Sequence, residues 1–201
     1  MEKKQIVMYG GCFNPPLNSH FTLAEQLINE YDQIDKVVFV PVNSKYQKAG
    51  LISNIHRYKM LQLVCSENEK MEVSKIELES KRPMYTIETL KELKKIYPNN
   101  EIALAIGSDN LKELDLWHKA EELIKNFKIY VISRDKDNIE DIIENHKLLK
   151  ENKSSFIKAK NNIISNLSST YVREKLKNNK SIRYLTADKV IKYIKENNLY
   201  I

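Results

Sequence analysis

The sequence has little glycine, little cysteine and no long apolar run. Its 201 residues include four glycines, two cysteines and one tryptophan. Two cysteines, Cys12 and Cys65, do not make a disulfide framework, and their spacing is not that of a metal site. The first residues do not read as a signal peptide, and no apolar run is long enough to span a membrane. These absences favour a protein of the reducing cytoplasm without a membrane partner.

Positive charge exceeds negative charge only modestly. Lysine and arginine contribute 33 residues against 27 acidic ones, which gives a formal net charge of +6. With 42% hydrophobic and 30% charged residues the composition is typical of a globular protein, and the length predicts a single domain over residues 1–201. Such a charge is compatible with anionic partners of any size and does not favour nucleic acid over a nucleotide.

Apolar runs typical of β-strands alternate along the chain with helical patterns. The strand-like runs cover 5–9, 37–42, 71–78, 102–106 and 127–132, and the helical patterns cover 20–32, 54–66, 87–97 and 118–125. This alternation predicts an α/β fold, a Rossmann-like doubly wound parallel sheet with helices on both faces, followed by a small C-terminal helical segment. Ligands of such sheets bind beyond the carboxyl ends of the strands. The polar stretch 135–155 is interpreted as a solvated helix with flanking loops.

Two of the four glycines, Gly10 and Gly11, stand directly after the first predicted strand. A helix follows at once, with His20 near its start. Bare backbone next to a helix N-terminus suits a phosphate, because N–H groups and the helix dipole both favour an anion there. The spacing matches neither the dinucleotide fingerprint nor a P-loop. An ordinary strand-to-helix turn remains the alternative on this local pattern alone.

A second phosphate signal lies near the end of the sequence. Three hydroxyl residues, Ser168, Ser169 and Thr170, precede a helical pattern whose first turn carries Arg173. One hydroxyl would suffice as a helix cap, although a plain cap with a surface arginine remains an alternative. Basic residues are also concentrated after the second strand, at Lys45, Lys48, Arg57 and Lys59. Three sources of positive potential at one pocket would suit a triphosphate.

These motifs resemble a known family, the nucleotidyltransferases with a G-G-x-F-[DN]-P-x-[HT]-x-x-H loop and a late S-S-T-x-[IV]-R motif. Within it the chain looks most like the nicotinate or nicotinamide mononucleotide adenylyltransferases. The resemblance covers nearly the whole chain and also includes residues 41–51, 85–90, 106–110, 181–185 and 199–200, in the expected order. It implies transfer of AMP from ATP to a pyridine mononucleotide, which yields deamido-NAD or NAD together with pyrophosphate, in NAD biosynthesis.

The resemblance also assigns site residues. It implies catalytic roles for His20 and Arg173, Mg²⁺ bound through the ATP phosphates rather than by the protein, and a C-terminal part from about residue 165 that completes the ATP site. The implied ATP-binding residues are Gly10, Gly11, Phe13, Asn14, His20, Lys48, Ser168, Ser169, Thr170 and Arg173, with Arg57 as a further candidate. The implied mononucleotide-binding residues are Tyr85, Thr86, Gly107, Asp109 and Trp117. Amides at the start of the helix after Tyr85 would favour a nicotinate carboxylate.

One position departs from the family pattern. Leu17 stands where relatives carry a histidine or a threonine that donates to phosphate, so Leu17→His or Leu17→Thr is expected to raise the rate. Two alternatives follow: a transferase of the same fold that acts on another phosphate acceptor, and a weakened or non-catalytic nucleotide binder. No nucleic-acid partner is expected, because the basic residues gather after strands. Assembly into a homo-oligomer is left open.

Overall fold

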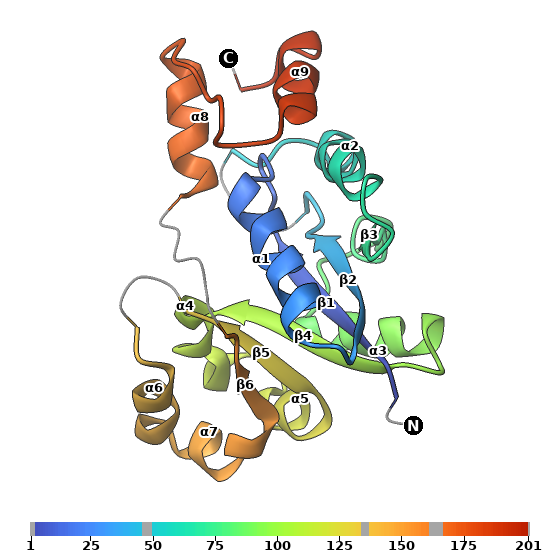
Figure 1. Ribbon diagram of the computed structural model, residues 1–201, viewed down its shortest axis with the longest axis vertical. Coiled ribbons are helices and arrows are strands. Elements are labelled where there is room, and N and C mark those ends of the chain that lie inside the picture. Colours follow the sequence, from blue (N-terminus) through green and yellow to red (C-terminus); the bar gives the residue numbers. More distant parts are fainter. Residues whose placement is uncertain (1–2, 46–49, 134–136, 161–166, 201) are drawn as a thin grey trace.

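The computed structural model describes residues 3–45, 50–133, 137–160 and 167–200, and in this part of the chain a six-stranded sheet forms the centre (Figure 1). All strand pairs are parallel, and the strand order is β3-β2-β1-β4-β5-β6. The strands are β1 (Gln5–Gly11), β2 (Ile34–Pro41), β3 (Met71–Val73), β4 (Glu101–Gly107), β5 (Lys128–Ile132) and β6 (Phe156–Lys158). The predicted Rossmann-like fold is confirmed. The order reverses between β1 and β4, which marks the place where such sheets bind ligands.

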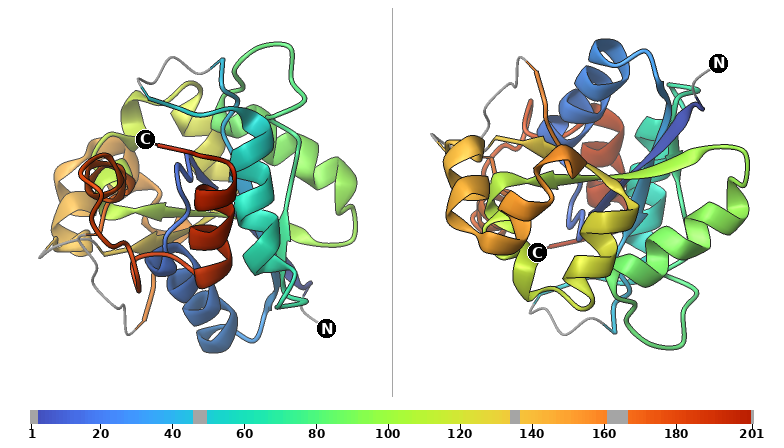
Figure 2. Two further views of the ribbon diagram at one scale, coloured as in Figure 1. Left: turned by 90° about the horizontal axis from the view of Figure 1, so that it is seen from above. Right: turned by 90° about the horizontal axis from the view of Figure 1, so that it is seen from below.

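Helices connect the strands and cover both faces of the sheet (Figures 1 and 2). The connecting helices are α1 (Asn18–Glu30), α2 (Asn54–Cys65), α3 (Thr86–Ile96), α4 (Ser108–Leu111), η1 (Leu114–Leu116) and α5 (Ala120–Asn126). After β5 come α6 (Ile139–Asn145), α7 (Lys147–Glu151) and η2 (Lys153–Ser155), and the last helices are α8 (Ser169–Lys177) and α9 (Asp188–Glu196). No helix in the described part of the chain is long and apolar enough to cross a membrane.

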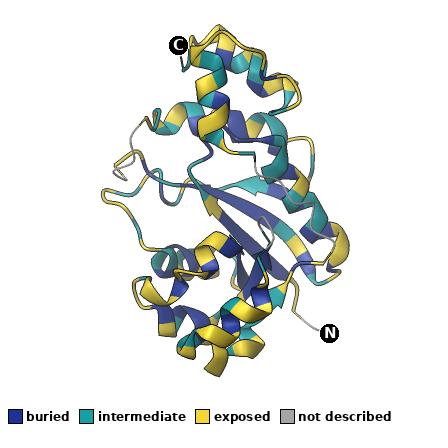
Figure 3. Ribbon diagram, turned by 90° about the vertical axis from the view of Figure 1, so that its left-hand side faces the viewer, coloured by how far each residue is buried: buried dark blue, intermediate teal, exposed yellow. Residues whose placement is uncertain are grey.

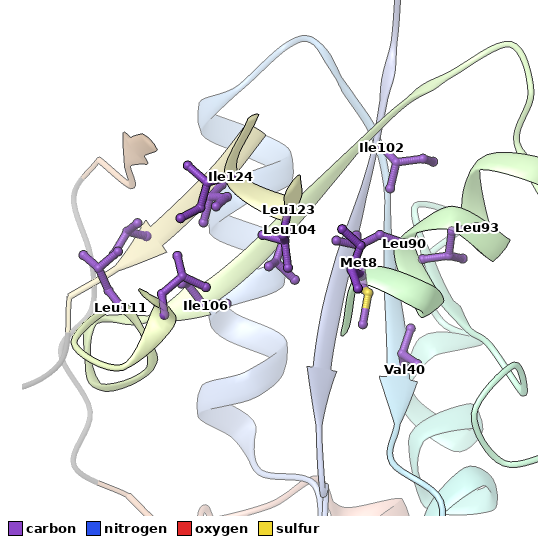
Figure 4. Close-up of a cluster of buried hydrophobic side chains, with 14 of the residues drawn as sticks. Met8, Val40, Leu90, Leu93, Ile102, Leu104, Ile106, Leu111, Leu123 and Ile124 are labelled. Carbon is purple, nitrogen blue, oxygen red and sulfur yellow. The ribbon is translucent and has the colours of Figure 1, made fainter. Parts of the chain in front are cut away.

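Neighbouring residues of one strand face opposite cores, because side chains alternate across a strand. Met8 and Leu104 pack on the face covered by α3, α5 and α6, where Leu90, Leu93 and Leu123 meet them (Figure 4). Tyr9 and Ala105 pack on the other face, against the apolar side of α1 and against α2. The strands are therefore buried on both sides, and exposed residues gather on the outer surfaces of the helices (Figure 3).

A third apolar cluster attaches α8 and α9 to the rest of the molecule. It joins Leu17, just before α1, and Met60 of α2 to Val172 of α8 and to Val190 and Ile194 of α9. Figure 2 shows α9 lying alongside α2, with α8 on the other side of the β1–α1 connection. The predicted C-terminal helical segment is thus packed over the carboxyl end of β1.

The sequence patterns were wrong or silent in three places. The third strand ends at Val73 instead of reaching residue 78, and the next residues form turns. The three-residue strand β6 was not predicted, since so short and half-buried a run has almost no periodic signal. The polar stretch 135–155 is not purely solvated, because Ile139, Ile143 and Leu149 are buried in the core.

Glu77 is a buried carboxyl group in the segment that links β3 to α3. Its side chain is 6% exposed and accepts a hydrogen bond from Thr89 Oγ1 at 2.8 Å. Its backbone carbonyl accepts one from Asn43 Nδ2, also at 2.8 Å. Burial raises the pKa of Glu77 to about 7, although the Thr89 hydrogen bond and the charge of Arg57 oppose the shift.

This pKa predicts a pH-dependent stability. Because the folded pKa lies above the unfolded value, Glu77 stabilises the fold fully only below the unfolded pKa, and that contribution is lost as the pH rises to about 7. We expect Glu77→Gln to gain stability relative to the parent between pH 5 and 7, by up to about 3 kcal/mol. Urea unfolding at several pH values measures this, with the exposed Glu79→Gln as control. A constant difference across this range would contradict the prediction.

Candidate active site

The loop between β1 and α1 is held in shape by side chains from distant elements. Four of its backbone carbonyl oxygens accept hydrogen bonds from side chains. Arg57 donates to Cys12 O at 3.1 Å and Arg173 donates to Asn14 O at 2.9 Å. Ser169 donates to Pro15 O at 2.9 Å and Thr186 donates to Pro16 O at 2.7 Å. The donors come from α2, from α8 and from the segment before α9. A loop with these four carbonyls engaged has little freedom to change conformation.

Phe13 anchors the middle of the loop. Its backbone is left-handed, with φ of 46°, and its ring makes edge contacts with His20 at 5.1 Å and Phe39 at 5.6 Å between ring centroids. A Cβ atom on Gly11 would come within 3.1 Å of this ring, so any other residue there would force the ring to shift. Gly10 is exposed at the end of β1, which leaves its backbone accessible to a ligand.

His20 is the third residue of α1, and its orientation is set by the start of that helix. Its Nδ1 accepts a hydrogen bond from the backbone N–H of Leu17 at 3.0 Å, in the arrangement of a capping box. An imidazole that accepts at Nδ1 carries its proton at Nε2 in the neutral form. The local helix start therefore makes Nε2 the donor of this side chain.

The three hydroxyl residues at the start of α8 have three different roles. Ser168 caps the helix by accepting from the N–H of Tyr171 at 3.2 Å, whereas Ser169 donates to the β1–α1 loop. Thr170 Oγ1 accepts from Nη2 of Arg173 at 3.1 Å, while Nη1 of Arg173 donates to Asn14 O. These bonds place the N-terminus of α8 beside the loop, as the resemblance implied.

Arg57 is not available to a nucleotide, and its assignment as a phosphate ligand is wrong. The side chain is fully buried, and burial lowers the pKa of its guanidinium. It donates to the carbonyls of Cys12, Ile52 and Val42 and to Asn54 Oδ1, at 2.5 to 3.1 Å. Arg57 therefore ties the loop to β2 and α2. Lys48 lies outside the described residues, so its predicted role is not tested.

Leu17 does not face a phosphate site. It is 1% exposed and packs against Met60, Val172 and Val190 in the cluster under α8 and α9. The expectation that Leu17 leaves a phosphate pocket without a donor is therefore contradicted, because the side chain is part of a core. The family motif singles out position 17, but it does not show the direction of the side chain.

The predicted mononucleotide residues lie at the carboxyl end of β4 and in α4, at the start of α3, and in the segment before α5. Gly107 ends β4 and Asp109 is in α4, across the switch point from the β1 loop. Ser108 between them donates to Asp137 Oδ2 at 2.7 Å, and Asp137 also pairs with Lys112. This end of the sheet is thereby fixed to the segment after β5.

An aromatic pair connects α3 to the segment before α5. The rings of Tyr85 and His118 stack with centroids 4.0 Å apart, which brings Tyr85 and Thr86 close to the backbone next to Trp117. Trp117 itself is half-buried against the core. His118 was not singled out from the sequence, because only its contact with Tyr85 distinguishes it from a surface histidine.

The start of α3 also carries a charge pair. Glu88 accepts from the N–H of Tyr85 at 2.9 Å and forms a two-pronged ion pair with Arg82, whose shorter contact is 2.6 Å. Arg82 is thus directed at Glu88, and this hydrogen bond lowers the pKa of Glu88 to about 2. Among the described residues no three His, Cys, Asp or Glu side chains gather as a metal site would require.

Comparison with known proteins agrees with this geometry. The model of the cytidylyltransferase-like family matches residues 8–175, from β1 into α8, and this defines the class. The chain is 35% identical over 198 residues to a probable nicotinate-nucleotide adenylyltransferase of Flavobacterium johnsoniae, with 98% of both chains covered. It is 31% identical over 199 residues to the nicotinate-nucleotide adenylyltransferase of Bacillus subtilis, with 98% of both covered.

A solved structure gives the same result for the fold. Nicotinic acid mononucleotide adenylyltransferase of Plasmodium falciparum, in complex with NaAD, matches with a TM-score of 0.77 at 24% identity and covers 98% of this chain and 97% of its own. The chain therefore belongs to the cytidylyltransferase-like family and, within it, to the nicotinate-nucleotide adenylyltransferases. The resemblance read from the motifs is confirmed.

Because Leu17 is buried, we predict that replacing it with a polar residue lowers stability and does not raise the rate. Leu17→His would place an imidazole in an apolar core, and we expect a destabilisation of roughly 2–4 kcal/mol with no increase in kcat. Leu17→Met keeps the volume and should cost less than about 1.5 kcal/mol. Urea unfolding and steady-state rates measure both. A well-folded Leu17→His protein that is faster than the parent would contradict the assignment.

His20 can be tested for two separate roles. His20→Gln keeps an acceptor for the Leu17 N–H, because glutamine suits this position of a capping box, but it loses the imidazole Nε2 donor. We expect near-parent stability and a kcat lower by about 10²-fold or more. His20→Ala should lose both the cap and the rate. If His20→Gln retained most of the parent kcat, His20 would be only a cap.

Proposed function

We propose that this chain transfers AMP from ATP to nicotinate mononucleotide, forming deamido-NAD and pyrophosphate in NAD biosynthesis. The observation that carries the proposal is the meeting of two phosphate-binding features at the switch point of the sheet. The β1–α1 loop with His20 and the N-terminus of α8 with Arg173 lie together there, and hydrogen bonds join them. The family and its named relatives support the same reaction.

The reaction needs alignment more than acid–base chemistry. The phosphate of the mononucleotide is largely ionised at neutral pH and attacks the α-phosphorus of ATP, while the bond to the pyrophosphate oxygen breaks. No protein nucleophile is required. The protein has to hold two anions in line and to stabilise the charge that develops on the leaving pyrophosphate.

We assign the phosphate contacts to the loop and to α8. Nε2 of His20 donates to the ATP phosphates, and the exposed backbone of Gly10, next to the half-buried Gly11, lets them approach. The first amides of α8 with the charge of Arg173 bind the β- and γ-phosphates. Lys48 adds a positive charge from the loop after β2. The C-terminal segment thereby completes the ATP site. ATP enters as its Mg²⁺ complex, since the donors at this site are amides and cationic side chains and not carboxylates.

The mononucleotide lies on the β4 side of the switch point. Asp109 accepts from ribose hydroxyls beside Gly107, and Trp117 lies at the pyridine end together with Tyr85 and Thr86. The first amides of α3 face the pyridine substituent. Arg82 neutralises Glu88 at that helix start, so the carboxylate of Glu88 does not repel a second carboxylate there.

Parallel kinetics test the substrate. We expect kcat/KM for nicotinate mononucleotide to exceed that for the nicotinamide form by about tenfold, which corresponds to about 1.4 kcal/mol, because amides at a helix N-terminus favour a charged acceptor. Pyrophosphate release from MgATP is measured with each mononucleotide, with phosphopantetheine as a control acceptor. Turnover only with the control would disprove the proposed function, and a preference for the amide would disprove the role of α3.

A further inference from the structure

Tyr200 returns from the end of α9 to the β1–α1 loop. After α9 the chain turns through residues in left-handed conformation, with φ of 49° at Asn198 and 67° at Tyr200. The ring of Tyr200 packs on the apolar cluster under α8 and α9, and its hydroxyl donates to Asn14 Oδ1 at 2.9 Å. A residue 186 positions away in sequence thus contacts the centre of the predicted phosphate loop.

Asn14 is the residue through which three other segments meet. It is 3% exposed, so its amide group has to be satisfied inside the protein. Its Nδ2 donates to Gly50 O at 2.7 Å, and its Oδ1 accepts from Tyr200 and, at 3.4 Å, from the N–H of Ile52. Its backbone carbonyl accepts from Arg173. The amide plane of Asn14 therefore joins the loop after β2 and the segment after α9 to the β1–α1 loop.

We propose that Tyr200 is a positioning residue for adenylyl transfer, which acts by fixing the side chain of Asn14. The proposal rests on the proposed function, because in that function the β1–α1 loop, which contains Asn14, binds the ATP phosphates. The Tyr200 hydroxyl holds Oδ1, so that Nδ2 points to Gly50 and keeps the loop after β2 against the phosphate loop. A shift of this junction would misalign the attacking phosphate and the α-phosphorus.

Two properties suit Tyr200 to this role. Burial raises the pKa of its hydroxyl, although Arg173 and Arg57 oppose the shift, so the group stays protonated and remains a donor across the physiological range. Its ring is fixed by packing on the cluster that also holds Leu17 and Val172. The hydroxyl is therefore set in place by the same contacts that attach α8 and α9.

The test removes one oxygen atom. We expect Tyr200→Phe to lower kcat by about 5- to 10-fold, the effect of one lost hydrogen bond, with KM for each substrate within about twofold of the parent. The matched control is Tyr193→Phe, which removes the hydroxyl that bonds to His56 Nδ1 at 3.0 Å, between α9 and α2, and does not touch the loop. It should lose stability similarly but keep the parent kcat. Equal effects on kcat for the two variants would overturn the proposal.

A double-mutant cycle asks whether Tyr200 acts through Asn14. In an Asn14→Ala background, Tyr200→Phe should cause no further loss of kcat, and an additive loss would overturn the proposal. Amide hydrogen exchange near Ile52 tests the same coupling without substrate. We expect the exchange rate to be higher in Tyr200→Phe than in the parent and unchanged in Tyr193→Phe. Unchanged exchange in Tyr200→Phe would also overturn it. Failure of the proposed function would appear separately, as a parent protein without turnover.

Discussion

The candidate site depends on hydrogen bonds that side chains from distant segments donate to the backbone of the β1–α1 loop. The carbonyl oxygens of Cys12, Asn14, Pro15 and Pro16 each accept a hydrogen bond from a side chain that lies far away in sequence. A phosphate-binding loop must present its N–H groups and His20 in a fixed arrangement, and unpaired buried carbonyls would destabilise such a loop. The structure pairs these carbonyls with protein donors. One set of bonds therefore both satisfies the loop and determines its shape.

The same bonds attach the C-terminal segment with α8 and α9 to the candidate site. Ser169, Arg173 and Thr186 supply three of the four donors, and all three lie in the C-terminal segment. Beneath them Leu17 packs into an apolar cluster with residues of both helices. Leu17 thus stabilises the attachment of the segment that carries the second predicted phosphate motif. The packing and the chemistry of the site are coupled through a single loop.

Buried ionisable groups position the segments around the candidate site. Arg57 directs its guanidinium to three carbonyls and one amide oxygen, so it joins the loop, β2 and α2 without reaching solvent. Glu77 is similarly enclosed, between Asn43 and Thr89. A basic residue in a pattern typical of phosphate binding can therefore serve the scaffold, because a buried guanidinium must find several acceptors. Its charge is unavailable to a ligand.

The sequence by itself determined the fold class and predicted where the candidate site lies. Alternating strand and helix patterns specify a parallel sheet, and the glycines with His20 and the hydroxyls with Arg173 mark the two predicted phosphate motifs, since these signals are local and periodic. Only the tertiary structure decided what Leu17, Arg57 and Tyr200 do. Leu17 is buried in the core, Arg57 is buried and donates to the backbone of the loop, and Tyr200 donates to Asn14. The direction of a side chain, and its partner from a distant segment, depend on packing that no local pattern encodes.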